Sequence, residues 1–260
     1  MRQLEVQYVE SERDRMGGLA DLAPASSGAA FVEWFEALEE QGPGQGDPLF
    51  PWLASEATLP QMKWFLRQEL AGEAGFDDLV ALAQLRLPAQ AKLELARNYW
   101  DELGRGSEGG MHGPMLEHLA KGLALDMSVP VAAESHALAN LMLALAMNRR
   151  YAYQLLGALG VVELTAPGRS AMVNEGLKRL GVAPDVRRYF ALHATLDIKH
   201  SRAWNREVFA PLVDAHPEAA VAFAEGALLR LAAGHRCFER YRRTFGLSED
   251  ARFARAEAAE

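Results

Sequence analysis

The stretch "YFALHATLDIKHSR", residues 189–202, places three metal-binding residue types in one helical pattern. Successive residues of an α-helix are rotated by roughly 100°, so positions i, i+4 and i+7 lie on the same side. His193, Asp197 and His200 have this spacing, and the same segment contains the apolar residues Phe190, Leu192, Leu196 and Ile198. The pattern predicts either a stripe of metal ligands or a solvated or hydrogen-bonded triad, because three residues on one helix do not complete a metal site.

Helical periodicity extends over the whole chain. Ala, Leu, Glu and Arg recur at helical spacing, and alternating runs of Val, Ile and Thr are missing. Pro, Gly and Ser/Thr signals set the boundaries and predict helices over 27–41, 58–85, 88–103, 111–124, 130–147, 149–165, 169–180, from about 184 through the quoted stretch, and 217–245. A break is expected at "APG", residues 166–168. The predicted fold class is all-α, a helical bundle.

The chain reads as one main domain with two polar ends. Residues 1–25 are polar and then rich in Gly, Ala and Pro, so we expect them to be loosely held. Residues 26–246 form the predicted domain, and residues 247–260 form a polar tail. Repeats of 20–50 residues and coiled-coil heptads are missing from the sequence.

Charge and composition exclude several classes of protein. The net charge is −8 over 260 residues, and there is no compensating basic block, which argues against nucleic acid or an anionic membrane as a partner. No run of 18 apolar residues and no signal-like start is present, so a cytoplasmic location is expected. The one cysteine, Cys237, excludes an internal disulfide and is interpreted as a buried structural thiol.

Further candidate ligands lie in three other segments. Glu102 and His112 flank the glycines of "NYWDELGRGSEGGMH", which a helix end followed by a loop would also explain. Glu69 and Glu73 lie one turn apart in "RQELAGEAGF", which is also typical of a solvated acidic stripe. Glu163 is the only charged residue between Arg150 and Arg169. A lone carboxylate in an apolar run is informative, because its burial requires a partner.

Taken together, the polar residues in otherwise apolar helices form a set of four carboxylates and three imidazoles: Glu73, Glu102, His112, Glu163, His193, Asp197 and His200. Four carboxylates would neutralise two divalent cations. Imidazole with carboxylate suits non-haem iron or manganese better than structural zinc, which prefers thiolates. The Glu-x-x-His signature of ferritin-like proteins is absent, which disfavours that fold.

The order of these residues resembles the haem-oxygenase-like di-iron oxygenases and oxidases, also described as iron-containing redox enzymes. "HATLDIKH" matches the H-x-x-x-D-x-x-H motif of that family, "DELG" and the following histidine match a second motif, and Glu163 precedes His193 by about 30 residues. The resemblance covers residues 48–245. It implies a haem-oxygenase-like bundle of about seven core helices plus an N-terminal helix, with the seven residues above as metal ligands. Glu73 is preferred over Glu69, because "EAGF" resembles the glutamate-then-phenylalanine pattern of the family.

The resemblance also implies a chemistry. Two Fe(II) ions, with manganese as a substitute, would activate O₂ as co-substrate through a peroxo-diferric intermediate, without haem. The substrate would be a small amino-acid-like or fatty-acid-like molecule, and the outcome N-oxygenation, desaturation or C–C cleavage. An external electron donor and a homodimer stay open as partners. The alternative is a non-catalytic helical metal-binding or scaffold protein of the same fold.

Some residues are candidates for holding that substrate. Carboxylate anchors could come from Lys199, Arg202, Arg149, Arg150 and Arg169, although surface solvation is the favoured interpretation of each of them. The aromatic residues that could line a pocket, or simply pack in the core, are Trp64, Phe65, Tyr99, Trp100, Tyr189 and Trp204.

Overall fold

The structure is a computed structural model that describes residues 2–18, 20, 23–73 and 75–247, except for the side chain of Glu73. Its helices are α1 (Arg2–Met16), α2 (Gly28–Gln41), α3 (Leu49–Ser55), α4 (Leu59–Glu73), α5 (Phe76–Ala83), α6 (Ala89–Glu102), α7 (His112–Gly122), α8 (Ala133–Met147), α9 (Ala152–Arg179), α10 (Arg188–Trp204), α11 (Ala210–Ala215) and α12 (Ala219–Phe245). The described residues contain no strand, which confirms the all-α prediction.

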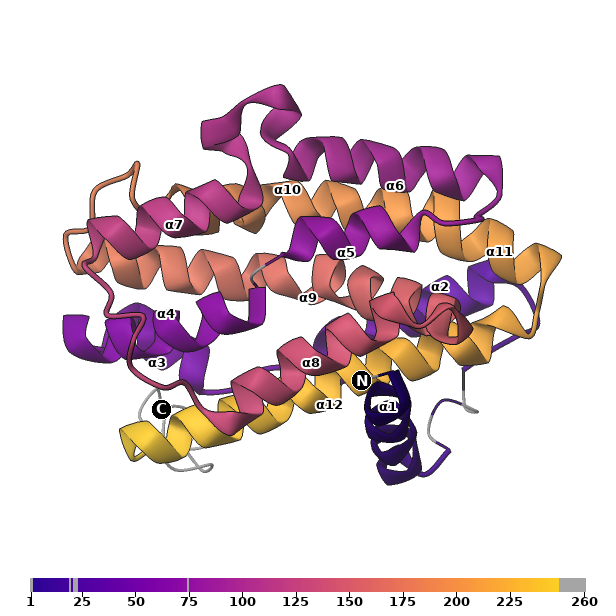
Figure 1. Ribbon diagram of the computed structural model, residues 1–260, viewed down its shortest axis with the longest axis horizontal. Coiled ribbons are helices and arrows are strands. Elements are labelled where there is room, and N and C mark those ends of the chain that lie inside the picture. Colours follow the sequence, from indigo (N-terminus) through magenta and orange to yellow (C-terminus); the bar gives the residue numbers. More distant parts are fainter. Residues whose placement is uncertain (1, 19, 21–22, 74, 248–260) are drawn as a thin grey trace, which may run out of the picture.

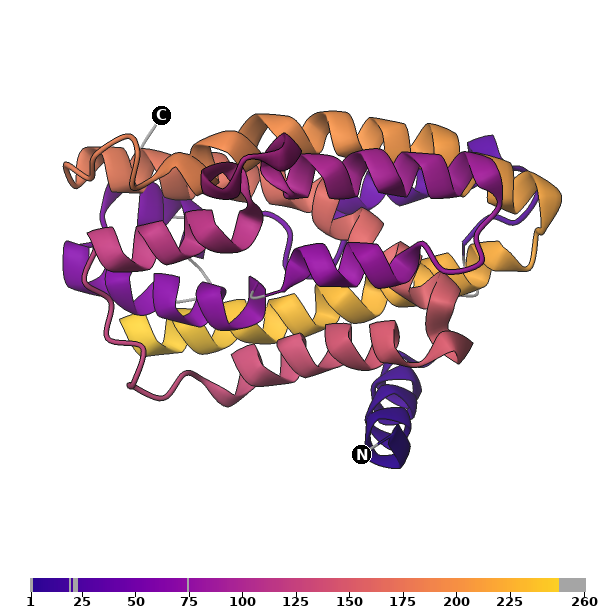
Figure 2. The same ribbon diagram turned by 45° about the horizontal axis from the view of Figure 1, so that its top comes forward.

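Helix α9 is the central element of the bundle. It packs along α12 on one side and α10 on another, and it also contacts α3. Most helices run along the long axis of the molecule, whereas α1 projects from it at a steep angle (Figures 1 and 2). The buried apolar side chains of these helices form one continuous core.

Two glycines allow α9 and α12 to cross closely. A Cβ atom on Gly157 would lie 1.9 Å from the carbonyl oxygen of Phe223, and one on Gly226 would lie 1.8 Å from that of Gln154. Both distances are far below van der Waals contact, so each helix requires glycine where it meets the backbone of the other. This crossing fixes the position of α9, which carries Glu163.

Two predicted helix starts have the expected caps. The Ser27 hydroxyl accepts a hydrogen bond from the Ala30 amide at 3.1 Å, at the beginning of α2. Ahead of α4, the Gln61 side chain accepts hydrogen bonds from the Thr58 amide at 2.8 Å and from the Thr58 hydroxyl at 2.7 Å. Side chains thus satisfy backbone groups that an isolated helix end would leave unpaired.

Two helix boundaries differ from the prediction. The predicted helix 58–85 is two helices, because Gly75 adopts a left-handed φ of 81° between α4 and α5. The break predicted at 166–168 is wrong, since α9 continues through Pro167 to Arg179. Proline removes one backbone donor from the helix, and the Thr165 hydroxyl donates to the Val161 carbonyl at 2.7 Å one turn earlier.

The N-terminal segment also differs from the expectation for residues 1–25, because Arg2–Met16 form α1. Val9 of α1 is buried in the core. Two polar contacts also hold α1 against α8 and α12: the Tyr8 hydroxyl donates to the Ala137 carbonyl at 2.9 Å, and Arg13 pairs with Glu225 at 2.6 Å. Such long-range pairs leave little trace in a hydrophobic pattern, which is why the sequence did not indicate this helix.

Two of the expectations concern regions that the structure does not decide. The predicted tail 247–260 lies outside the described residues beyond position 247. The domain limits at 26 and 246 stay predictions.

Among the described residues, no helix is both long and apolar enough to cross a membrane.

Candidate metal centre

Four helices bring five of the predicted ligands together. Two groups of buried donor atoms, each within 4.8 Å of one another, share one residue, Glu102 from the end of α6. We call them the His112 group, made of Glu102, His112 and His193, and the His200 group, made of Glu102, Glu163 and His200. A carboxylate common to two donor groups is an arrangement suited to holding a pair of cations.

The His112 group gathers around one oxygen of Glu102. His112 Nδ1 lies 3.0 Å from Glu102 Oε2, and His193 Nε2 lies 3.8 Å from the same oxygen. His193 Nδ1 donates to the Tyr189 carbonyl at 2.7 Å, one turn earlier on α10. With its proton on Nδ1, His193 directs the Nε2 lone pair at Glu102, which is where a cation would be held.

The His200 group gathers around the other oxygen. His200 Nδ1 lies 3.9 Å from Glu102 Oε1 and 3.3 Å from Glu163 Oε2. The second oxygen of Glu163 accepts a hydrogen bond from Asn98 Nδ2 at 2.6 Å. Glu102 therefore turns one carboxylate oxygen to each group, as a bridging ligand would.

Outer contacts orient several of these ligands. His200 Nε2 lies 3.2 Å from Asp101 Oδ2, and the Tyr189 hydroxyl lies 3.3 Å from His112 Nε2. Asp101 is itself held by Arg105, whose Nε donates to Oδ1 at 2.6 Å. Metal-binding imidazoles are commonly fixed in this way through the nitrogen that does not face the metal.

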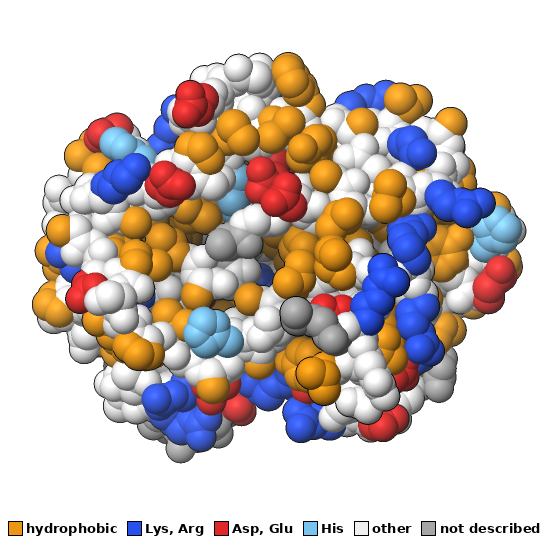
Figure 3. Space-filling view, viewed as in Figure 1, with side chains coloured by type: hydrophobic (Ala, Val, Ile, Leu, Met, Phe, Trp, Pro, Cys, Tyr) orange, Lys and Arg blue, Asp and Glu red, His pale blue; other side chains and the backbone are white. Residues whose placement is uncertain are grey.

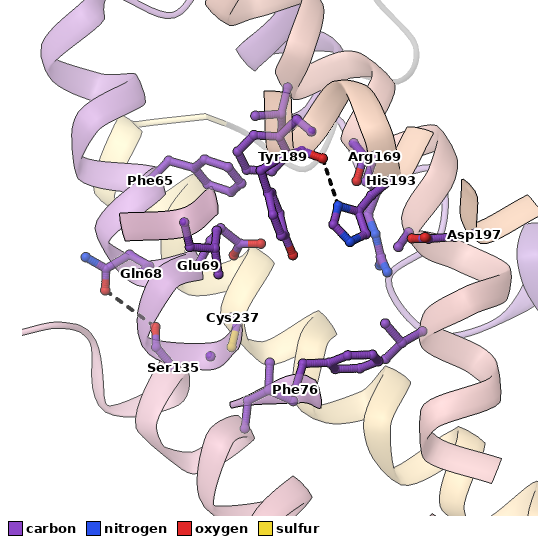
Figure 4. A pocket seen from close by; sticks show the side chains of 18 of the residues that line it. Phe65, Gln68, Glu69, Phe76, Ser135, Arg169, Tyr189, His193, Asp197 and Cys237 are labelled. Carbon is purple, nitrogen blue, oxygen red and sulfur yellow. Dashed lines mark hydrogen bonds between the residues drawn. The ribbon is translucent and has the colours of Figure 1, made fainter. Parts of the chain in front are cut away.

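Asp197 lies on the same face of α10 but outside both groups. Its side chain is buried and lies near His193 in the wall of a cavity (Figure 4). Glu102 and Glu163 line the same cavity. Burial, and then the negative charge of Glu163, raise the pKa of Asp197 well above its ordinary value. Burial and the neighbouring Glu163 carboxylate thus disfavour the ionised form of Asp197.

Two buried atoms of the cluster have no hydrogen-bond partner: Asp197 Oδ1 and His200 Nδ1. A buried polar atom without a partner is unfavourable, and a lone pair directed at a cation removes this penalty. The donor set, imidazole nitrogen with carboxylate oxygen, suits iron or manganese. The residues present therefore fit a pair of such ions.

The neighbouring carboxylates also shift the pKa values of the buried histidines. Burial opposes the charged form of His193, but its interaction with Glu102 and the charge of Asp197 outweigh burial and raise its pKa to about 9. Burial likewise opposes the charged form of His200, and its interactions with Glu163 and Asp101 raise the pKa to about 10. Burial raises the pKa of Glu102, yet His112 and His193 shift it below its usual range.

A cavity that is partly open to solvent lies beside the cluster. Glu102, His112, Glu163, His193 and Asp197 lie in its wall. Much of the remaining wall is apolar, including Phe50, Phe65, Phe76, Leu116, Leu138, Val173, Phe190 and Phe238.

The first carboxylate of the predicted set is placed only in part. Glu73 is the last residue of α4, and its side chain lies outside the described part of the chain. Glu69, the alternative, lines the cavity one turn earlier but belongs to neither donor group (Figure 4). The choice between them stays a prediction.

Among the basic anchor candidates, Arg169 lines the cavity. Its guanidinium carbon lies 5.8 Å from the ring centre of Phe50 and 5.4 Å from that of Phe238. The guanidinium also donates a hydrogen bond to the Thr165 hydroxyl at 2.7 Å. Arg149 and Arg150 lie along a separate surface groove. On the face shown in Figure 3, several Lys and Arg side chains lie on the right side. Lys199 and Arg202 are exposed.

Some of the aromatic candidates line the cavity and others do not. Phe65 and Tyr189 line the cavity, Trp204 is buried in the core, and Trp100 is 52% exposed. Cys237 is buried as expected and also lines the cavity. Burial, followed by the charge of Glu69, raises the pKa of its thiol to about 12, which disfavours a nucleophilic thiolate.

Sequence reasoning missed Asn98, and it named Tyr189 only as an aromatic residue that could line a pocket, not as a partner of the ligands. Asn98 precedes Glu102 by four positions, and Tyr189 precedes His193 by four, so each shares a helix face with a ligand. Arg230 and the buried trio Gln68, Ser135 and Tyr241 also line the cavity. Helical spacing from a known ligand is the signal that would have found the first two.

The fold and the buried imidazole–carboxylate cluster define a class of all-α proteins with a metal-site-like centre inside the bundle. The family model described as iron-containing redox enzyme matches residues 63–235. The chain belongs to this family. The comparison with curated proteins finds no match.

Solved structures support the haem-oxygenase-like fold. A CADD-like protein of unknown function from Nostoc punctiforme superposes with a TM-score of 0.63 at 19% identity, covering 82% of this chain and 95% of that chain. A domain of unknown function with a heme oxygenase-like fold from Shewanella denitrificans superposes with a TM-score of 0.55 at 15% identity, covering 84% and 90%. Similarity at such low sequence identity supports a shared fold and nothing about function. The predicted haem-oxygenase-like bundle is confirmed.

Proposed function

We propose that this protein is a non-haem di-iron oxygenase or oxidase that uses O₂ to oxidise a small molecule. The observation that carries the proposal is Glu102, whose two carboxylate oxygens face two separate donor groups. Membership of the iron-containing redox enzyme family supports iron as the metal. When bound, two Fe(II) ions would supply electrons to O₂ and the oxidising power for the substrate.

The residues of the chain have distinct parts in this proposal. His112 and His193 would hold one ion, His200 and Glu163 the other, and Glu102 both, with Asp197 and Glu73 as further ligands of the predicted set. Asn98 fixes the orientation of Glu163 through its hydrogen bond. Burial of the cluster limits contact with bulk water, which strengthens each electrostatic interaction.

The cavity supports a small substrate with an apolar body and a charged group, in keeping with amino-acid-like or fatty-acid-like molecules. Phe50, Phe65 and Phe238 provide apolar surface, and Arg169, Arg230 and Glu69 place charges in the wall. A substrate that binds here lies against the face of the cluster formed by Glu102, His193 and Asp197. Candidate acids and amines can be ranked by how far each accelerates O₂ uptake by the Fe(II)-loaded protein.

The proposal is tested by loading the purified protein with Fe(II) anaerobically, removing loose metal, and measuring iron per chain and O₂ uptake. We expect about two irons per chain and O₂ uptake that depends on them, because two donor groups are present. His193→Ala should bind fewer than two irons. His118→Ala removes an imidazole that pairs with Asp185 at the surface, so it serves as the matched control and should bind two.

The possible results separate the two classes of protein. Two bound irons without O₂ uptake would favour a metal-binding scaffold of the same fold. Wild-type iron content in His193→Ala would refute the ligand assignment.

A further inference from the structure

The two donor groups have different outer contacts, and those of the His200 group lead to the protein surface. Asp101, next to Glu102 at the end of α6, uses both carboxylate oxygens: Oδ2 lies 3.2 Å from His200 Nε2, and Oδ1 accepts from Arg105 Nε at 2.6 Å. The His200 side chain is 6% exposed, that of Asp101 20%, and that of Arg105 71%. A continuous polar chain thus runs from a buried imidazole to solvent.

Asp101 determines which nitrogen of His200 faces the cluster. A carboxylate accepts, so the contact with Asp101 requires the proton of His200 to be on Nε2. Nδ1 is then the nitrogen that faces the cluster, 3.3 Å from Glu163 Oε2, and its lone pair is available to a metal ion once its proton is displaced. Without Asp101, the ring would lose the contact that fixes both its rotation and its tautomer.

Arg105 occupies an unusual backbone position. It has a φ of 54°, between Gly104 at 60° and Gly106 at 84°, in the glycine-rich loop that the bridge between Leu103 and Met111 closes. Residues with a Cβ rarely adopt positive φ. An exposed ion pair contributes little to stability, so stability does not account for an arginine here. Its side chain does hold the carboxylate that holds His200.

We propose that Asp101 is a positioning residue for His200 and that Arg105 holds Asp101 in place, so that the glycine-rich loop 104–110 acts on the His200 metal position through the side chain of Arg105. The inference rests on the proposed two-metal site. The His112 group is oriented instead by Tyr189, through its hydroxyl to His112 and its carbonyl to His193. The side chain of Arg105 links the loop to the His200 group through Asp101.

The test uses Mn(II) bound to the whole protein without O₂. Calorimetric titration gives the affinity of each position, and electron paramagnetic resonance separates an isolated Mn(II) from a coupled pair. We expect Asp101→Ala to weaken one of the two positions by about 10–100-fold and to lose the coupled signal, because removing an outer partner has effects of this size. Arg105→Gln should weaken the same position less.

Conservative and matched variants exclude a general loss of structure. Asp101→Asn retains an oxygen that accepts from His200 Nε2, so it should recover most of the two-metal binding that Asp101→Ala loses. Glu117→Ala removes an exposed ion pair with Lys121 on α7 and should bind like the wild type. Tyr189→Phe should weaken a single position as well, and combined with Asp101→Ala it should weaken both.

A double variant decides whether Asp101 acts through His200. Because a positioning residue has nothing to position once its ligand is gone, Asp101→Ala should have no further effect in the His200→Ala background. A further loss there, or wild-type affinity in Asp101→Ala alone, would overturn the inference while leaving the two-metal site intact. A wild-type protein that binds fewer than two Mn(II) ions would overturn both.

Discussion

Asp197 illustrates how a single side chain is unfavourable for the metal-free fold. It is 3% exposed, one of its oxygens has no hydrogen-bond partner, and the charge of Glu163 adds to the effect of burial in raising its pKa. A raised pKa means that the ionised carboxylate destabilises the folded state above that pKa and that protonation relieves the effect. Such residues are retained where function requires them.

We therefore expect Asp197→Asn to stabilise the metal-free protein and to weaken metal binding. Asparagine stays neutral at every pH, so the gain should be about 1 kcal/mol, or roughly 2–4 °C in melting temperature for a domain of this size. Thermal melting with a chelator and Mn(II) titration measure the two effects. Glu175→Gln, which alters an exposed carboxylate of α9, is the control and should change neither. A lower melting temperature for Asp197→Asn without metal would contradict this interpretation.

At the scale of elements, α9 has to approach α12 closely enough to bring Glu163 to the cluster. The contact depends on Gly157, where a Cβ atom would lie 1.9 Å from the Phe223 carbonyl oxygen. Backbone atoms cannot give way as a flexible side chain can. A side chain at this position must therefore push the two helices apart.

Gly157→Ala should destabilise the fold by about 1–3 kcal/mol or more, because the added methyl group overpacks a backbone contact. Gly168→Ala, in the same helix, adds a Cβ that meets nothing within 4 Å. It should stabilise the fold by roughly 0.5–1 kcal/mol, because alanine loses less backbone entropy than glycine when the helix forms. Urea unfolding of both variants measures the difference. Equal stability of the two would show that α9 and α12 are farther apart than the structure places them.

At the scale of the whole molecule, protons and metal ions compete for the same buried histidines. In the metal-free state the pKa of His193 is raised to about 9 and that of His200 to about 10. Groups whose pKa is raised by folding contribute stability that is complete below about pH 6.5, the ordinary value, and that is lost as the pH rises through 9–10. Metal binding must displace these protons.

The metal-free protein should thus lose stability between pH 6.5 and 9, whereas the affinity for Mn(II) should rise over that range. The difference in melting temperature between the Mn(II)-loaded and metal-free forms is expected to widen with pH. Melting curves at fixed Mn(II) and with chelator, from pH 6 to 9, check this. In His193→Ala the widening should be smaller. A difference that is constant with pH would mean that these histidines do not bind the ion.

The sequence by itself determined the fold class and much of the cluster. Helical periodicity and caps such as Ser27 predicted the helices, since these signals are local along the chain. The spacing of His193, Asp197 and His200 predicted that all three lie on one face, and all three are buried. Glu163 was indicated because a carboxylate in an apolar run requires a partner.

Only the tertiary structure decided which residues meet and through which atoms. The contacts of Glu102 with both donor groups depend on the packing of α6 against α10 and on the approach of α6 to Glu163 in α9. No spacing along the chain encodes this arrangement. The continuity of α9 through Pro167 and the docking of α1 depend on contacts with distant helices. Packing brings together residues far apart in sequence, such as Asp101 and His200, and helical periodicity describes only the neighbours of each residue on its own helix.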